Sequence, residues 1–254
     1  MLNKSNISKI DFKNLYIEQK NLSDFKEKDP SEWDEKANSF NDYKKHENYI
    51  NEFIKNVDFS GCDSLLDFAC GAGLLARACS NKVDELILYD FSPKMCEFTK
   101  INCPNAKVIC GSFDDLNHSA DLVFASRCLG VNDLSSALEI LLSKTKKRLY
   151  FTYKIDETYI SEHIINALNL DINPTPNYIY AANILYELGY FFTLNKISIE
   201  NKASFVNYES LKKSVEFSYK KLSENEEKIL KELYLSGVDL SKSNTEWALF
   251  CVEK

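Results

Sequence analysis

The chain has 254 residues, 44% of them apolar, which is enough for one sizeable core and does not require a second independent domain. Its 38 acidic residues outnumber its 31 Lys and Arg residues. The resulting net charge of −7 disfavours nucleic acid as a partner, because such binding depends on neutralising phosphates. The most apolar long stretch, residues 178–192, is interrupted by polar side chains and is too short for a bilayer, so we expect no membrane partner.

The cysteines lie mostly inside apolar runs, and no two of them have the C-x-x-C spacing of a zinc or redox site. We therefore expect reduced core thiols and no metal. A chain of this size does not need disulfides and opens with no signal peptide, which favours the cytoplasm. The eight cysteines are Cys62, Cys70, Cys79, Cys96, Cys103, Cys110, Cys128 and Cys251.

Residues 1–44 are predicted to form an N-terminal helical lid or extension. Residues 1–30 are polar with scattered apolar anchors, and a loosely held helix or a mobile terminus fits them equally well. Trp33, Phe40 and Tyr43 follow, either to close over a bound molecule or to pack along a helix edge. From Lys45, helical spacing of apolar residues as far as Val57 predicts an amphipathic helix that leads into the first strand.

Residues 45–155 then alternate between strand-like and helix-like segments. Strands are expected at 64–69, 86–90, 106–110, 121–126 and 148–153, and helices at 74–80, 92–101 and 133–144. Such alternation predicts a mostly parallel sheet with helices on both faces. Ser92 and Pro93 are typical of a helix start, and Asp133 or Asn132 is expected to cap the last of these helices.

Residues 156–254 are expected to supply a small helical cap and two final strands, within a single domain of residues 1–254. The helices are predicted at 157–168, 178–188, 208–222 and 224–235, with Gly189 ending the second. The strands are predicted at 190–199 and 246–253.

The most informative string is LLDFACGAGLLA, residues 65–76, in which an apolar strand ends in an acid and a glycine-rich turn opens a helix. Gly71 and Gly73 allow the backbone to turn tightly and to approach a ligand closely. In open α/β sheets, ligands bind at this end of the strands. The string therefore predicts a binding loop.

The spacing acid-x-x-Cys-Gly-x-Gly, formed by Asp67, Cys70, Gly71 and Gly73, resembles the first motif of class I S-adenosylmethionine-dependent methyltransferases. Ala69 stands where many members have glycine. The resemblance implies a Rossmann-like sheet of seven strands with a C-terminal antiparallel pair, and S-adenosylmethionine as cofactor with S-adenosylhomocysteine as product. It also implies that Asp67 contacts the cofactor's ammonium group, directly or through water. The alternative is an acid that caps the following turn.

Three further strand ends extend this resemblance. Asp90 lies 17 residues beyond Gly73, where a carboxylate can accept hydrogen bonds from both ribose hydroxyls. The adenine is expected near the residues after Asp90 and near Phe113 and Asp114, although Met95 fits a core position equally well and the acids could simply solvate a loop. The fourth strand ends at Arg127, expected to face the sulfonium and the acceptor or else to be a surface arginine.

The predicted cofactor-binding residues are Asp67, Ala69, Cys70, Gly71, Gly73, Asp90, Phe91, Ser92, Met95, Ser112, Phe113, Asp114, Ser126 and Arg127. The predicted acceptor-binding residues are Trp33, Tyr43, Arg127 and Tyr153.

No catalytic base is predicted, because methyl transfer needs alignment, and it needs a base only if the acceptor must lose a proton. Tyr153 and His163 could polarise an acceptor, but structural roles are favoured for both. The fourth strand lacks the Asn-Pro-Pro-aromatic signature of many amino-nitrogen methylases, and with the acidic charge this favours a small-molecule acceptor. The acceptor's identity and the oligomeric state stay open.

Three alternatives remain. GAGLLA also fits the G-x-G-x-x-A fingerprint of nicotinamide dehydrogenases, but Asp67 just before the glycines would repel a pyrophosphate. A catalytically silent module that binds S-adenosylmethionine would carry the same motifs. An enzyme that uses an altered form of the cofactor would also carry them.

Overall fold

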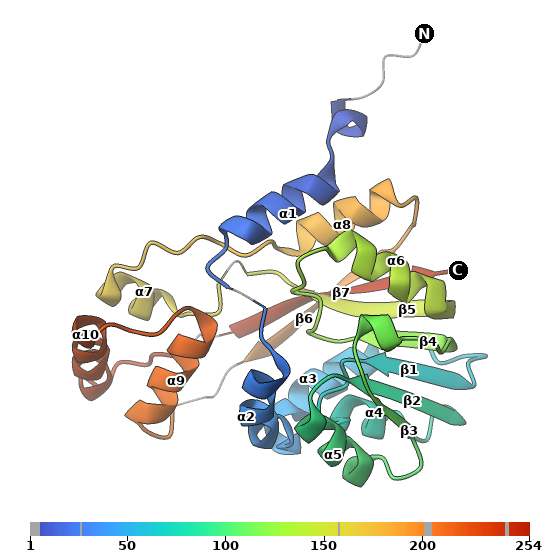
Figure 1. Cartoon of the computed structure of the whole chain (residues 1–254), viewed down its shortest axis with the longest axis horizontal. Coiled ribbons are helices and arrows are strands. Elements are labelled where there is room, and N and C mark those ends of the chain that lie inside the picture. Colours follow the sequence, from blue (N-terminus) through green and yellow to red (C-terminus); the bar gives the residue numbers. More distant parts are fainter. Residues whose placement is uncertain (1–5, 26, 157, 201–204, 242–243) are drawn as a thin grey trace.

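The computed structural model describes residues 6–25, 27–156, 158–200, 205–241 and 244–254. Its centre is a seven-stranded sheet in the order β3-β2-β1-β4-β5-β7-β6 (Figure 1). The first five strands are parallel neighbours, and β7 runs antiparallel to both β5 and β6, as predicted. The strands are β1 Ser64–Phe68, β2 Glu85–Asp90, β3 Lys107–Cys110, β4 Ala120–Ala125, β5 Thr145–Lys154, β6 Thr193–Glu200 and β7 Asn244–Glu253.

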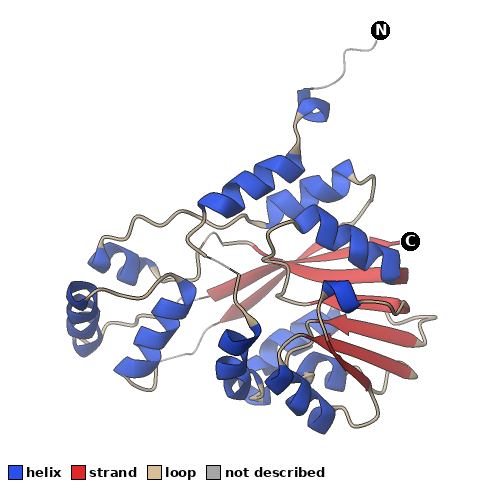
Figure 2. Cartoon of the chain, viewed as in Figure 1, coloured by secondary structure: helices blue, strands red, loops and turns tan. Residues whose placement is uncertain are grey.

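Helices connect these strands and cover both faces of the sheet (Figure 2). Ser92 caps the helix that begins at Pro93, and Asp133 caps the helix after β4, as expected. The helices are α1 Phe12–Leu22, α2 Pro30–Phe40, α3 Tyr43–Lys55, α4 Leu74–Ala78, α5 Pro93–Asn102, α6 Leu134–Lys144, α7 Glu162–Leu168, α8 Tyr178–Glu187, α9 Tyr208–Ser218 and α10 Glu224–Leu235, with short 3-10 turns η1 Asn6–Lys9 and η2 Phe113–Asp115.

Two predicted helix boundaries are wrong. The helix expected from residue 157 begins only at Glu162, because Thr158 accepts the Ile160 N–H in a local turn and keeps the described residues before Ser161 out of helical geometry. Residue 157 lies outside the described residues. The helix expected over 208–222 ends at Ser218, where the Glu216 carboxylate accepts the N–H of Leu222 and folds the chain back.

Each face of the sheet has its own core, because successive strand residues point to opposite sides. Leu66 and Phe68 of β1 face α1, α6 and α8, and Leu65 faces α2, α3 and α5. Tyr16 on α1 is only 1% exposed, so the part of residues 1–30 that forms α1 is packed against the sheet. Residues 1–5 and 26 lie outside the described residues.

A third apolar cluster joins α7, α9 and α10 into a cap with its own small core, beyond the sheet in Figure 1. Leu211 and Leu230 are fully buried there. No helix among the described residues is long and apolar enough to cross a bilayer.

The eight cysteines are all free thiols. Cys62, Cys79, Cys96 and Cys103 are buried, as expected of core thiols. The expectation is wrong for Cys110, which is exposed because it stands at the outer end of the edge strand β3. The other three are half-buried: Cys70, Cys128 and Cys251.

Candidate functional site

The glycine-rich loop after β1 turns through three residues with left-handed backbone, Ala69 at φ 54°, Gly71 at 58° and Gly73 at 73°. A Cβ on Gly73 would lie 3.0 Å from Cγ2 of Thr99, so this glycine permits close packing against α5. A Cβ on Gly71 would meet nothing within 4 Å and would point into open space. Gly71 therefore keeps the backbone accessible, whereas Gly73 keeps the loop and α5 together.

Asp67, at the end of β1, is the least satisfied acid near this loop. It is 1% exposed, and neither carboxylate oxygen has a hydrogen-bond partner among the described residues. Burial, reinforced by the charge of Asp90, raises the pKa of Asp67 to about 8. A buried carboxylate without donors is costly, so this position is suited to a ligand that brings a cationic donor.

Asp90, at the end of β2, holds the glycine loop from the neighbouring strand. One of its oxygens accepts the Gly71 N–H at 2.8 Å, and the other accepts the Ser92 N–H at 2.9 Å. Burial raises the pKa of Asp90 to about 6, and the charge of Asp34 adds to the rise. Each oxygen keeps a lone pair for a second donor, because a carboxylate has about four acceptor positions.

Two of the residues predicted to contact adenine have structural roles instead. Ser92 is fully buried, where its hydroxyl accepts the Met95 N–H and donates to Asp34 on α2. Met95 is 2% exposed in the core beneath α5. Neither side chain offers surface to a ligand, and only Phe91 of this group is partly exposed.

At the end of β3, the residues predicted to flank adenine form the turn η2. Ser112 caps this turn through its hydroxyl, while Asp115 accepts the Ser112 N–H, so Asp115 is committed to the turn and Asp114 is exposed. The half-buried ring of Phe113 packs against Phe68, with ring centroids 4.0 Å apart. Phe113 thus lies beside Phe68, the residue that follows Asp67 at the end of β1.

The ends of β4 and β5 are joined through Tyr49, a residue of α3. Its hydroxyl hydrogen-bonds with Ser126 at 2.7 Å and with Thr152 at 2.9 Å. The guanidinium of Arg127 lies 4.1 Å from the centre of the Tyr49 ring. Arg127 has left-handed backbone, φ 58°, and donates its N–H to Thr152. Sequence reasoning missed Tyr49, because its place on the apolar face of a helix explains its burial and gives no signal for its hydroxyl.

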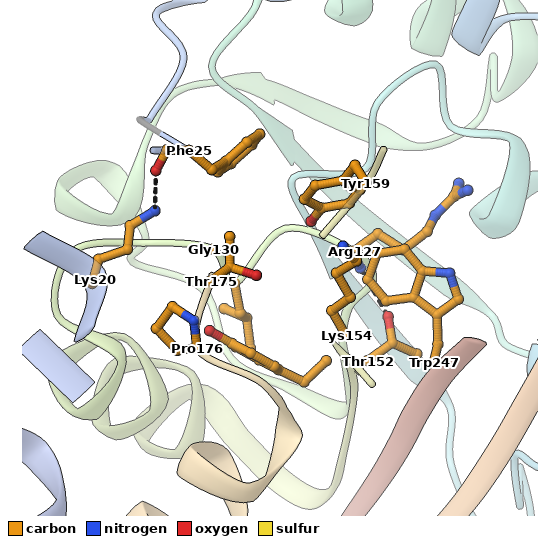
Figure 3. Close-up of a pocket in the computed structure, with 12 residues that line it drawn as sticks. Lys20, Phe25, Arg127, Gly130, Thr152, Lys154, Tyr159, Thr175, Pro176 and Trp247 are labelled. Carbon is orange, nitrogen blue, oxygen red and sulfur yellow. Dashed lines mark hydrogen bonds between the residues drawn. The ribbon is translucent and has the colours of Figure 1, made fainter. Parts of the chain in front are cut away.

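Arg127 and Tyr153 line a pocket at the ends of β4 and β5, shown in Figure 3, with about 410 Å³ of space, its open mouth included. Tyr153 is largely buried and donates its hydroxyl to Tyr16. Sequence reasoning missed several other side chains of this lining, which come from α1, the segment after α1, the end of β5, the segment after β5, and β7. They include Lys20, Phe25, Lys154, Tyr159 and Trp247.

Trp33 and Tyr43, the other residues predicted to bind the acceptor, are not among the residues that line this pocket. Trp33 packs between Phe40 and Phe217, with centroids 5.6 and 5.7 Å away. Tyr43 lies 5.1 Å from the Arg77 guanidinium on α4. Both side chains instead make contacts between elements of the protein.

The three histidines also lie outside the pocket lining. Burial, together with the charge of Arg127, lowers the pKa of His46 to about 4. His118 hydrogen-bonds with Tyr89 and Lys107, and His163 is exposed.

A family model described as "Methyltransferase domain" matches residues 65–147, which include the glycine loop and Asp90. A Haemophilus influenzae protein, described only as uncharacterized, is 30% identical over 236 residues, 87% of this chain and 88% of that one. The chain belongs to the class I S-adenosylmethionine-dependent methyltransferases.

Two solved methyltransferase structures share its fold. The plantazolicin methyltransferase BamL, in complex with a triazolic desmethylPZN analog and SAH, is 12% identical with a TM-score of 0.57, over 96% of this chain and 99% of that one. Magnesium protoporphyrin IX methyltransferase (ChlM) from Synechocystis PCC 6803, with bound SAH, is 11% identical with a TM-score of 0.52, over 82% and 81%. At these identities the two structures show only that the fold is shared. Membership of the methyltransferase family, in contrast, argues against the alternative of a nicotinamide dehydrogenase.

Proposed function

We propose that this methyltransferase binds S-adenosylmethionine at the carboxyl ends of β1 to β4 and methylates a small molecule held in the pocket of Figure 3. The observation that carries the proposal is Asp67, a buried carboxylate without a described donor, beside the left-handed glycine loop. The cofactor's ammonium group would supply the missing donors. When bound, the cofactor supplies an electrophilic methyl group on a sulfonium that departs as a neutral thioether.

The other strand ends would hold the nucleoside. Asp90 would accept the ribose hydroxyls through the lone pairs that its two backbone donors leave free. The backbone at Ala69, Cys70 and Gly71 would approach the amino acid part of the cofactor, since the open space above Gly71 admits a ligand. Phe113 and Asp114 would flank the adenine.

The protein's task in such a reaction is alignment and exclusion of water. The pocket would hold an acceptor lone pair in line with the methyl carbon, to which it would form the new bond, and the electron pair of the S–C bond that breaks would go to sulfur. Among the described residues lining the pocket there is no imidazole or carboxylate to remove a proton. Burial raises the pKa of Tyr159 to about 12 and that of Tyr153 well above its ordinary value. We therefore assign no catalytic base, and expect an acceptor atom that already has a free lone pair.

Two observations support a small-molecule acceptor and a reducing compartment such as the cytoplasm. The pocket is lined mostly by aromatic and apolar side chains such as Phe25, Leu129 and Trp247, with a few polar groups, as sites for small ligands usually are. Eight free thiols fit a compartment that keeps cysteines reduced.

A thermal-shift comparison of S-adenosylmethionine, S-adenosylhomocysteine and NAD tests the cofactor. We expect the first two to stabilise the chain selectively, by about 2.7 kcal/mol at a hundredfold excess over Kd, because they bind only the folded state. Asp67→Asn is the matched variant and should reduce the response. Equal or larger stabilisation by NAD would refute the proposal.

Transfer of a labelled methyl group to low-molecular-weight metabolites tests catalysis. Label in a small product supports the proposal. Selective cofactor binding with no label transferred would favour the silent binding module.

A further inference from the structure

Two thiols lie close to the backbone of Asp90: that of Cys96 on α5 and that of Cys110 at the end of β3. The Cys96 thiol donates to the carbonyl oxygen of Asp90 at 3.2 Å. The same oxygen accepts the N–H of Gly111, the residue after Cys110, at 2.9 Å. One carbonyl oxygen therefore holds both the Cys96 thiol and the peptide group that joins Cys110 to Gly111.

The side chain of Cys110 faces α5, which packs against β3 (Figure 1). Successive residues of a strand point to opposite faces of the sheet. Val108, two residues before Cys110, packs with Cys103 of α5, whereas Ile109 packs on the other face. Burial raises the pKa of the Cys96 thiol to about 12, and a hydrogen bond with the Cys110 thiol adds to the rise. The two thiols thus face one another across the contact between α5 and β3.

The two thiols differ in their access to solvent. Cys110 is exposed, whereas Cys96 is only 3% exposed, and both are free thiols in this structure. A small oxidant in solution can therefore reach Cys110 first, while Cys96 is held beside it. An accessible thiol next to a second thiol that can react with its oxidised form is the usual arrangement of redox-sensitive cysteines.

The turn after Cys110 has little room to absorb a movement of that residue. A Cβ added to Gly111 would lie 2.8 Å from the side chain of Asp115, so the backbone at Gly111 already packs closely against it. The Asp115 carboxylate accepts the N–H of Ser112 and closes the turn η2. A displacement of Cys110 toward α5 would therefore move η2 and disturb the hydrogen bond from Gly111 to the Asp90 carbonyl.

We propose that Cys96 and Cys110 form a site of reversible oxidation, at which hydrogen peroxide produces a disulfide that weakens nucleoside binding at the neighbouring strand ends. The effect on binding rests on the proposed function, which places the ribose at Asp90 and the adenine at η2.

The reaction proceeds in two steps that balance. The Cys110 thiolate attacks one oxygen of the peroxide, the O–O bond breaks, and a sulfenic acid and hydroxide form. The sulfur of Cys96 then attacks the sulfenic sulfur, so that the S–S bond forms and the S–O bond breaks. The departing oxygen takes the proton of the Cys96 thiol and leaves as water. A dithiol reductant returns both thiols by exchange.

Peptide mapping by mass spectrometry, after treatment of the full chain with hydrogen peroxide, tests the disulfide. We expect Cys96 and Cys110 of the same chain to become linked, and dithiothreitol to reverse the link. Cys110→Ser should abolish it, whereas Cys251→Ser, which removes a half-buried thiol on β7, should leave it unchanged. The proposal is overturned if peroxide leaves Cys96 a free thiol or joins Cys110 to any other cysteine.

Calorimetric titration of S-adenosylhomocysteine into the reduced and the oxidised chain tests the consequence for binding. We expect the disulfide to weaken binding at least fivefold, and dithiothreitol to restore it. Peroxide-treated Cys110→Ser should bind as tightly as the reduced, unaltered chain, which also shows that this variant folds and that no other oxidation causes the loss. An affinity unchanged by the disulfide overturns the proposal.

The reduced chain separates this proposal from the cofactor assignment. If the reduced chain fails to bind S-adenosylhomocysteine, the proposed function fails, whatever peptide mapping shows. If the reduced chain binds S-adenosylhomocysteine and peroxide does not link Cys96 to Cys110, only the oxidation site fails.

Discussion

Replacing Asp67 by Asn should stabilise the protein without ligand and weaken its binding of cofactor. Burial raises the pKa of this carboxyl from its ordinary 3.8 to about 8, so the folded state holds the proton more tightly than the unfolded state does. The contribution of Asp67 to stability is therefore full below pH 4 and is lost as the pH rises toward 8. The rise of about four pKa units corresponds to roughly 6 kcal/mol at about 1.4 kcal/mol per unit. Allowing for relaxation of the site, we expect Asp67→Asn to gain at least about 2 kcal/mol at pH 9.

The assay is thermal unfolding of both proteins from pH 5 to pH 9. For a chain of this size, a gain of about 2 kcal/mol corresponds to a rise in Tm of roughly 4–8 °C. The difference between the two proteins should grow with pH and should shrink when S-adenosylhomocysteine is added, because the ligand's ammonium stabilises the ionised Asp67. If the Tm values of the two proteins differed by the same amount at every pH, the result would refute the description of Asp67 as a buried carboxyl without hydrogen-bond donors.

Three substitutions test the rest of the loop and its neighbour. Ala69→Gly should raise the free energy of unfolding by between zero and about 1.6 kcal/mol, because the roughly 1–2 kcal/mol of left-handed strain that it removes is offset by about 0.4–1 kcal/mol of added unfolded-state entropy. A loss above about 1 kcal/mol in urea unfolding would contradict this. Gly73→Ala should lower the free energy of unfolding by about 2–4 kcal/mol in the same measurement, because its Cβ would lie 3.0 Å from Cγ2 of Thr99. Gly71→Ala should lower it only by the strain of about 1–2 kcal/mol, but should weaken the binding of S-adenosylhomocysteine. Asp90→Asn should weaken the binding of S-adenosylhomocysteine at least tenfold in calorimetry, since charge-assisted hydrogen bonds to ribose are worth about 1.5–3 kcal/mol, and should change the free energy of unfolding by less than about 1 kcal/mol. An unchanged affinity would show that Asp90 does not bind the ribose.

The sheet could be predicted from the sequence because the parallel strands are apolar runs that alternate with helical segments, and two of those helices, α5 and α6, have their own start signals. Ser92, Pro93 and Asp133 gave those signals locally, and the structure has the expected caps. The helix boundaries in the cap were missed because side-chain hydrogen bonds to nearby backbone decide them. Thr158 and Glu216 each make such a bond, and hydrophobic periodicity does not register it.

The glycine loop was located from its motif, and the structure adds why Ala69 is unusual there: it adopts a backbone conformation that glycine adopts without strain. The pocket could not be read in the same way. Lys20, Arg127 and Lys154 come from three separate segments, and each alone resembles an ordinary surface cation. Trp33 drew attention as an aromatic ahead of the first strand, but its ring packs against α9.

Helix α2 contacts two parts of the molecule through successive residues. Asp34 accepts hydrogen bonds from the hydroxyl of Ser92 and the N–H of Lys94, at the start of the helix that follows Asp90. Its neighbour Trp33 packs on Phe217 in the cap. An outward displacement of the cap must therefore either break the Trp33 contact or pull α2, and with it Asp34, away from the turn beside Asp90. Opening of the cap and the shape of that turn are thereby mechanically linked.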